Sequence, residues 1–364
     1  MKKLVTRMIV FILIFIVIGE SSVRFRDFLK GHGFFTNYRD RLILKESTIV
    51  PFRMFGPHFY TEINGKKYIL SSHNELYPFK KPENTFRIVC LGGSTTRNPV
   101  PFRKYKIHYP LVLQRLLQDS IKDKNIEVIN AGYESFATPH ILILLELDVI
   151  SWKPDLIIVS DNHNDLDAAY WKDFQLDYSN KYGTKWFLPQ FLKDYTTLNA
   201  SFHWSSLFWY IKDKIQTYEE NLNRNNFLLQ RRASYGNIPP QICQYTFKRN
   251  LLNIFAIAHN CGIPVLFASQ PINRNVESAD FLPYDQNEPR QVLPLLPEWK
   301  SQYKFYNKLI KEVADSTNSY FVDNDALFAE DSIYFIDAVH YTKLGVEKIA
   351  KNYTDYIISK HIIK

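Results

Sequence analysis

The chain has 364 residues, of which 46% are apolar and 23% are charged. This length allows one large domain with insertions or two domains, and this composition excludes wholesale disorder. The formal net charge is +8, but lysine and arginine are spread along the whole sequence without a basic run. No zinc-finger or RNA-binding signature is present either, so nucleic acid is not expected as a partner.

The N-terminus predicts a membrane anchor or a signal segment over residues 1–22. Three basic residues come before an apolar run from Met8 to Gly19, which Glu20 ends, and this order is typical of an export segment. Counted from Leu4, the apolar stretch makes about 24 Å of helix, and a snorkelling Arg7 lengthens it toward the ~30 Å of a hydrocarbon core. A cleaved signal peptide and an uncleaved anchor both stay open, and the lack of a clear cleavage pattern favours the anchor. The basic flank places the rest of the chain outside the cytoplasm.

Residues 23–84 form an aromatic and basic N-terminal extension whose function the sequence does not reveal. Its clearest signal is Asn64-Gly65, which predicts a hairpin within residues 59–70. The three cysteines of the chain are widely spaced and include no C-x-x-C pair, so neither a disulfide framework nor a structural zinc site is expected. We interpret them as core thiols, with a pair between the last two as the alternative: Cys90, Cys243 and Cys261.

A regular alternation of strands and helices begins after residue 84. Short apolar runs predict strands over residues 86–91, 126–130, 155–160, 262–268 and 320–323. Longer segments between and after them predict helices over residues 110–121, 139–152, 240–259, 298–316 and 341–360. Five buried strands separated by helices indicate a parallel sheet covered on both faces, that is, a three-layer α/β/α sandwich over residues 85–364.

Residues 168–236 interrupt this alternation and predict a partly helical insertion. The segment is rich in aromatic residues, among them Trp171, Trp186, Trp204 and Trp209. Two interpretations stay open. The rings form a lid or substrate platform, because aromatic side chains stack on sugars and lie at membrane interfaces, or they are buried within a helical subdomain of their own.

Polar residues gather where the predicted strands end. Ligands bind at the carboxyl ends of the strands in parallel α/β sheets, so these residues are the candidate site. The blocks are Gly92-Gly93-Ser94, Asn130-Ala131-Gly132, Asp161-Asn162-His163-Asn164, Ser269-Gln270 and, before the last helix, Asp337-Ala338-Val339-His340.

A serine after the first strand, a glycine after the second, an asparagine after the third and a C-terminal D-x-x-H resemble the SGNH (GDSL-like) hydrolase family. The resemblance covers about residues 86–360 and implies a flavodoxin-like arrangement of the sheet. Asn162 stands where the family usually has glycine. If that position is left-handed, asparagine is among the best substitutes.

The resemblance implies a catalytic triad. Ser94 is the nucleophile, His340 is the base that takes its proton, and Asp337 fixes the orientation of the imidazole. The resemblance also implies an oxyanion hole made by the Ser94 and Gly132 amides and the Asn164 side chain. Three further residues are expected to line the pocket: Asn162, His163 and Gln270.

The expected function is a serine-dependent esterase that hydrolyses acyl esters, above all O-acetyl esters, through an acyl-enzyme. The external location points to an acylated glycan or lipid as substrate, and neither a metal nor an organic cofactor is expected. Two alternatives stay open: an O-acyltransferase with the same triad, and a membrane-anchored binding or assembly protein without catalysis.

Overall fold

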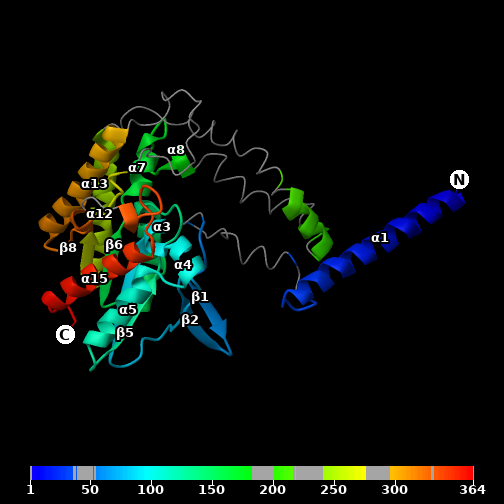
Figure 1. The fold of residues 1–364 in the computed structure, drawn as a ribbon, viewed down its shortest axis with the longest axis horizontal. Helices are drawn as coiled ribbons and strands as arrows, with labels where there is room; N and C mark the ends of the chain where they lie inside the picture. Colours follow the sequence, from blue (N-terminus) through cyan, green and yellow to red (C-terminus); the bar gives the residue numbers. More distant parts are fainter. Residues whose placement is uncertain are drawn as a thin grey trace. The chain divides into compact units, whose positions relative to one another are not determined.

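The structure is a computed structural model of the chain (Figure 1). It describes residues 2–35, 38, 52, 55–182, 201–202, 204–215, 218, 241–275, 296–328 and 332–363. Contacts group the chain into two compact units. Residues 1–50 and 184–231 make the N-terminal unit, and residues 51–183 and 232–364 make the sheet unit. The predicted boundaries at residues 22, 84, 168 and 236 divide the chain differently and stay a prediction.

The sheet unit is built on a five-stranded parallel sheet with the strand order β5-β4-β6-β7-β8. β4 lies between β5 and β6, and its continuous apolar run suits this buried position. The five predicted strands are confirmed. They are β4 (Thr85–Gly92), β5 (Asn125–Asn130), β6 (Leu156–Ser160), β7 (Val265–Ala268) and β8 (Tyr320–Val322).

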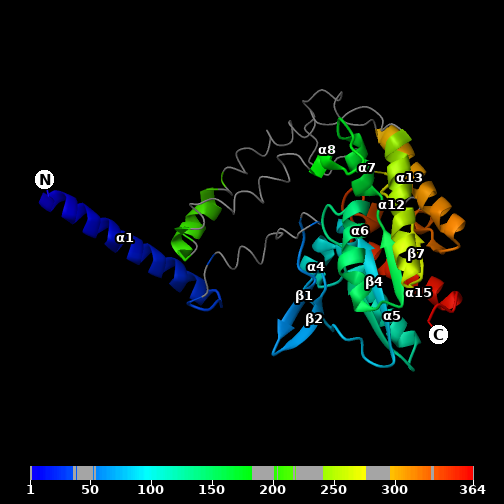
Figure 2. The same cartoon turned by 180° about the vertical axis from the view of Figure 1, so that it is seen from behind.

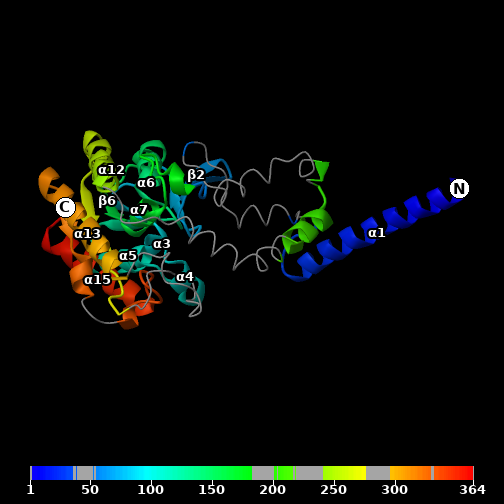
Figure 3. The ribbon, with the colours of Figure 1, turned by 90° about the horizontal axis from the view of Figure 1, so that it is seen from above.

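Helices cover both faces of this sheet. α5 (Tyr109–Ser120) and α15 (Lys343–Ser359) pack together on one face, over alternate strand residues such as Ile88 and Ile158. On the opposite face, α12 (Gln241–Asn260) packs against both α6 (Thr138–Leu147) and α13 (Leu296–Thr317). Figure 3 shows α6 and α12 on one side of the strands and α5 and α15 on the other. The predicted three-layer α/β/α fold is therefore confirmed.

Shorter elements connect these layers. They are α3 (Ser94–Arg97), α4 (Pro99–Tyr105), the 3-10 helix η1 (Val149–Trp152), α7 (His163–Tyr170), α8 (Ser179–Tyr182), α14 (Asn324–Leu327) and the 3-10 helix η4 (Ser332–Tyr334). The helix predicted over residues 139–152 is thus two elements, because α6 ends at Leu147 and η1 follows. The last helix begins at Lys343, where the Thr342 side chain accepts from the Gly345 amide and caps it.

A small antiparallel sheet precedes the main one and consists of β1 (Tyr60–Ile63), β2 (Lys66–Leu70) and β3 (Leu76–Pro78). The predicted hairpin is confirmed: Asn64 and Gly65 both have positive φ, as its two-residue turn requires. The buried Arg87 of β4 ties this sheet to the main one. It donates to the Pro78 carbonyl at 2.8 Å and pairs with Glu127 at 2.7 Å.

Two of the three cysteines are core thiols as predicted. Cys90 and Cys243 are buried and free, whereas Cys261 is free and exposed. The interpretation as a core thiol is therefore wrong for Cys261, because α12 has ended at Asn260 and the chain turns on the surface there. The alternative pair between Cys243 and Cys261 is wrong as well.

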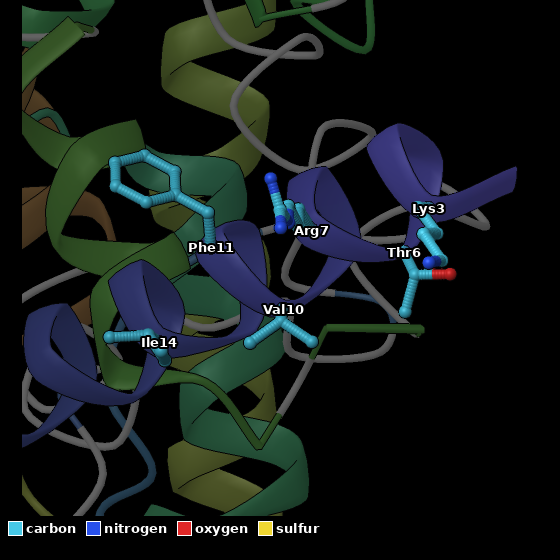
Figure 4. A pocket seen from close by; sticks show the side chains of 6 residues that line it. All are labelled: Lys3, Thr6, Arg7, Val10, Phe11 and Ile14. Atoms are coloured by element: carbon cyan, nitrogen blue, oxygen red, sulfur yellow. The ribbon is translucent and has the colours of Figure 1, made fainter. Parts of the chain in front are cut away.

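The N-terminal unit is dominated by α1 (Lys2–Leu29). Its 28 residues make about 42 Å of helix, and its apolar window has a mean hydropathy of 2.2 with none of it buried. By length and composition α1 is therefore able to cross a membrane. Figure 4 shows one stripe at the start of α1, which is basic or polar at Lys3, Thr6 and Arg7 and apolar from Val10 onward.

The described part of the insertion is helical at residues 206–215, which agrees with the predicted partly helical segment. These residues pack beside the end of α1, around a small core of Val23, Tyr38 and Trp209 (Figures 1 and 2). Of the tryptophans noted in the sequence, Trp171 and Trp209 are buried, and Trp204 is 51% exposed. Trp186 lies outside the described residues.

Candidate active site

The site begins where β4 meets the short helix α3. Gly93 is the N-cap of α3, and Ser94 is its first residue. The Ser94 amide therefore lies in the first turn, where the N–H groups have no hydrogen-bond acceptor within the helix. Such an amide is available to an incoming oxyanion at the carboxyl edge of the sheet.

The loop before α15 brings Asp337 and His340 to this serine. His340 Nε2 lies 2.7 Å from Ser94 Oγ, and His340 Nδ1 lies 2.8 Å from Asp337 Oδ2. The other carboxylate oxygen of Asp337 accepts from the amides of Val339 and His340 at 3.0 and 2.8 Å. The structure thus connects the three predicted triad residues in one hydrogen-bonded chain.

Two opposing effects set the pKa of Asp337. Burial of the carboxyl favours its neutral form, but the hydrogen bonds from the His340 ring and the two amides outweigh this. The pKa of Asp337 therefore lies below its ordinary value. The carboxylate stays ionised at neutral pH and can hold the imidazole in one orientation.

Asn164 reaches the site from α7, which follows β6. Its Nδ2 donates to the Phe136 carbonyl at 2.7 Å and occupies the space that a side chain at position 93 would need. An amide nitrogen carries two hydrogens, so one bond to Phe136 leaves the second for another acceptor. The structure therefore places this donor against the residue that precedes Ser94.

Gly132 lies against Thr96 and Arg97 of α3. A Cβ there would meet Thr96 Cβ at 2.6 Å and the Arg97 amide at 2.8 Å, so this close approach requires glycine. The Gly132 amide already donates to Asn130 Oδ1 at 3.1 Å. For the oxyanion role predicted for it, Gly132 would have to exchange this hydrogen bond for one to the substrate.

The three predicted pocket residues are buried and brace the site. Asn162 has φ −158°, so the hypothesis of a left-handed backbone there is wrong. Its Nδ2 instead donates to Asn307 Oδ1 at 2.8 Å and to the Tyr303 carbonyl at 3.1 Å, which fixes the loop to α13. Gln270 accepts from the His163 amide at 2.9 Å and donates to Thr95 Oγ1 at 2.8 Å.

Two buried carboxyls, those of Asp161 and Asp165, lie near Asn164 in the chain. Asp165 accepts from the Thr138 amide at 3.0 Å and from the Tyr178 hydroxyl at 2.7 Å, which joins the start of α6 to α7. Burial raises the pKa of Asp165 to about 6 and that of the neighbouring Asp161 well above its ordinary value. Asp165 thereby fixes the start of α6 and Tyr178 next to Asn164.

Sequence reasoning missed Ser72, which supports the Gly132 loop from the N-terminal extension. The Ser72 amide and hydroxyl reach the Asn130 carbonyl at 2.8 and 3.0 Å, and the hydroxyl also donates to the Gly132 carbonyl. Ser72 lies between β2 and β3, far from the four blocks in sequence. Because no motif surrounds it, only the tertiary fold reveals it.

Replacing Ser72 with alanine is expected to lower the free energy of unfolding by about 1–2 kcal/mol, because the Gly132 carbonyl loses its hydroxyl donor while the Asn130 carbonyl keeps only the Ser72 amide. Urea denaturation followed by circular dichroism measures this change. Ser120→Ala is the matched control, since this exposed hydroxyl bonds only within its own helix and its loss is expected to change stability by less than about 0.5 kcal/mol. Equal stability of Ser72→Ala and the wild type would contradict the supporting role.

Comparisons with known proteins give structural neighbours only. No protein-family model matches the chain, and no curated protein matches it. The solved structures that resemble it include Axe2, an acetylxylan esterase from Geobacillus stearothermophilus, at 15% identity and a TM-score of 0.44, covering 75% of this chain and 94% of that one. LAE5, an alpha/beta hydrolase enzyme from the metagenome of Lake Arreo, Spain, has 13% identity and a TM-score of 0.44, covering 77% and 96%. The acetyl xylan esterase AlAXEase has 14% identity and a TM-score of 0.44, covering 74% and 98%.

Proposed function

We propose that the chain is an SGNH-type serine esterase that cleaves acyl esters through an acyl-enzyme. The observation that carries the proposal is the chain of contacts from Ser94 Oγ to His340 Nε2 at 2.7 Å and from His340 Nδ1 to Asp337 Oδ2 at 2.8 Å. A serine hydroxyl gains nucleophilicity when a base within hydrogen-bond reach takes its proton and a third group orients that base.

In the acylation half, the Ser94 oxygen attacks the ester carbonyl carbon while its proton moves to His340 Nε2. The Asp337 carboxylate accepts from His340 Nδ1 and stabilises the imidazolium that forms. The C–O bond to the alcohol then breaks, and the imidazolium returns its proton to the leaving oxygen. The acyl group is left on Ser94.

In the second half, water takes the place of the alcohol. His340 removes a proton from the water, the hydroxide adds to the acyl carbon, and the Ser94 oxygen leaves as it regains a proton. Both halves develop negative charge on the carbonyl oxygen, next to the Ser94 amide and the second N–H of Asn164. A Gly132 amide released from Asn130 would be a third donor.

The proposed substrate is an O-acylated glycan or lipid outside the cytoplasm, with O-acetyl as the simplest acyl group. α1 supports this external location. Its basic start and exposed apolar length suit an uncleaved anchor that leaves the sheet unit outside the cytoplasm. The triad chemistry needs neither metal nor organic cofactor.

Labelling with a fluorophosphonate probe tests the proposal. The full-length protein in detergent is expected to take up the probe at Ser94, located by peptide mass spectrometry, because only an activated serine reacts. Ser94→Ala is expected to take up none, and Ser359→Ala, which removes an exposed hydroxyl, is expected to label like the wild type. A folded wild-type protein that takes up no label would overturn the proposal.

Replacing Asn164 with alanine is expected to lower kcat for p-nitrophenyl acetate by about 10²–10³, with little change in KM. The reason is that its side-chain donor acts on the charge of the transition state more than on the neutral ester. Steady-state kinetics measure both constants. Asn125→Ala, at the far end of β5, is the control and is expected to leave both unchanged. A rise in KM alone would show that Asn164 binds substrate without stabilising the oxyanion.

A further inference from the structure

Within the N-terminal unit, the partly buried carboxylate of Glu20 joins α1 to residues 205–207. The two oxygens of Glu20 accept from the Ser206 amide at 2.9 Å, the Leu207 amide at 2.8 Å and the Ser205 hydroxyl at 3.0 Å. They thereby satisfy the first amides of helical residues 206–215, which have no acceptor within that helix. Glu20 is thus a helix cap supplied from a distant part of the sequence.

Further contacts fix the same junction. Arg24 pairs with Glu20 at 2.8 Å and donates to the Trp204 carbonyl at 3.2 Å. A Cβ at Gly19 would meet a methyl carbon of Leu207 at 2.7 Å, so the two helices approach closely there. Residues 205–207 therefore pack against the last turn of the apolar run of α1.

If α1 crosses a bilayer, this contact sets the depth of residues 204–207 in it. Glu20 lies 16 residues after Leu4, about 24 Å along the helix, and a hydrocarbon core is about 30 Å thick. Ser205 and Leu207, which contact Glu20 and Gly19, must then lie at the boundary between hydrocarbon and headgroups. The start of the insertion helix cannot be far from lipid.

The surface around this junction has the composition of a membrane interface. Large apolar side chains of residues 20–35, 201–202 and 204–215 are exposed by 40% or more: Phe25, Phe28, Leu29, Phe35, Phe202, Trp204, Ile211 and Ile215. Aromatic rings are enriched at the headgroup level of membranes, where one end of the ring is apolar and the other meets water. Water alone is a poor solvent for so many exposed rings.

We propose that residues 20–35, 201–202 and 204–215 form an interfacial collar, which lies in the headgroup region of the leaflet at the C-terminal end of α1. The partner is phospholipid and not a second copy of the chain, because the apolar surface of the collar continues directly from the exposed apolar length of α1. The inference rests on α1 crossing a membrane and is independent of the esterase chemistry. The anchor is uncleaved in this arrangement, since cleavage after Ser21 or Ser22 would remove Glu20.

Depth-dependent fluorescence quenching tests the collar in the full-length chain, reconstituted in vesicles of phosphatidylethanolamine and phosphatidylglycerol. Cys261→Ser removes the exposed thiol, and single labelled cysteines are then placed by Phe15→Cys in the span, Phe202→Cys in the collar and Ile333→Cys in the sheet unit. We expect headgroup spin labels to quench position 202 most, and mid-chain spin labels to quench position 15 most. Aqueous iodide is expected to quench position 333 several-fold more than position 202.

The controls separate the collar from the span. Phe35→Cys is a second collar position whose side chain is 89% exposed, so its replacement leaves the packing intact, and it is expected to behave like position 202. A deep label at 15 with positions 35 and 202 as open to iodide as 333 would overturn the collar and leave the anchor standing. Shielding that grows with the ratio of protein to lipid would show a second copy as the partner and overturn the proposal as well.

The cap gives an independent readout. Glu20→Ala is expected to make the label at 202 more open to iodide, because residues 206–215 lose the carboxylate that caps them and joins them to α1, and to leave the label at 15 unchanged. Glu62→Ala, an exposed glutamate of β1, is the matched control and is expected to change neither. Full shielding at 202 in Glu20→Ala would show that Glu20 does not hold the collar. Ester hydrolysis, measured on the same samples, reports separately on the proposed function.

Discussion

Replacing His340 with alanine is expected to lower kcat/KM for p-nitrophenyl acetate by about 10⁴-fold or more, because Ser94 then lacks the base that takes its proton. The imidazole is the group that lies 2.7 Å from Ser94 Oγ in the structure. Steady-state hydrolysis at neutral pH measures the loss. His259→Ala, which removes an exposed imidazole at the end of α12, is the control and is expected to keep the wild-type rate.

The double variant Ser94→Ala/His340→Ala sharpens this test. Groups that act as one unit are not additive, so the double variant is expected to be no slower than the slower single variant. Two losses that multiply would mean that Ser94 and His340 act independently. The hydrogen-bonded chain described for the site would then not be the catalytic unit.

Replacing Asp337 with asparagine is expected to lower kcat by about 10⁴-fold, although the side chain keeps its shape. The carboxylate accepts from His340 Nδ1 at 2.8 Å and thereby leaves Nε2 as the acceptor that Ser94 needs. An amide at position 337 can donate to that ring and favour the opposite tautomer. Asp355→Asn, an exposed acid paired with Lys351, is the control and is expected to have no effect on kcat.

The lowered pKa of Asp337 gives this variant a second signature. A carboxyl whose folded-state pKa lies below its unfolded value stabilises the fold above the unfolded value, and this stabilisation is lost as the pH falls through the folded one. The wild type is therefore expected to be more stable than Asp337→Asn at neutral pH, with the difference shrinking below the ordinary value of 3.8. Urea denaturation over a pH series measures this difference, and one that stays constant with pH would contradict the shift.

Much of the sheet unit was predictable because local sequence patterns mark its strands. Short apolar runs that end at glycine or at a polar residue gave the five strands, and the Asn64-Gly65 turn gave the hairpin. Element ends were less accurate. The fourth strand begins at Val265 and not at Gly262, because Gly262 has a positive φ in the turn after α12 and Pro264 has no N–H to donate to a neighbouring strand.

In the candidate site as well, local sequence patterns revealed some features and only the structure revealed others. Ser94, Asn164, Asp337 and His340 were found from sequence because each lies in a short block at the edge of the sheet, and the structure brings them together. Their catalytic roles stay a prediction until the variants are measured. Local spacing did not reveal that Asn162 binds α13, because that bond joins residues more than a hundred positions apart.

The sequence by itself determined which segments become buried strands, which residues stand at their ends and that the N-terminus carries an apolar segment after basic residues. These properties follow from residue type and short-range periodicity, which a chain carries before it folds. Only the tertiary structure decided that Ser72 supports the Gly132 loop, that Gln270 links Thr95 to His163, and that Glu20 caps a helix near residue 206. Such contacts depend on how distant segments meet once apolar surface is buried, and no local pattern records them.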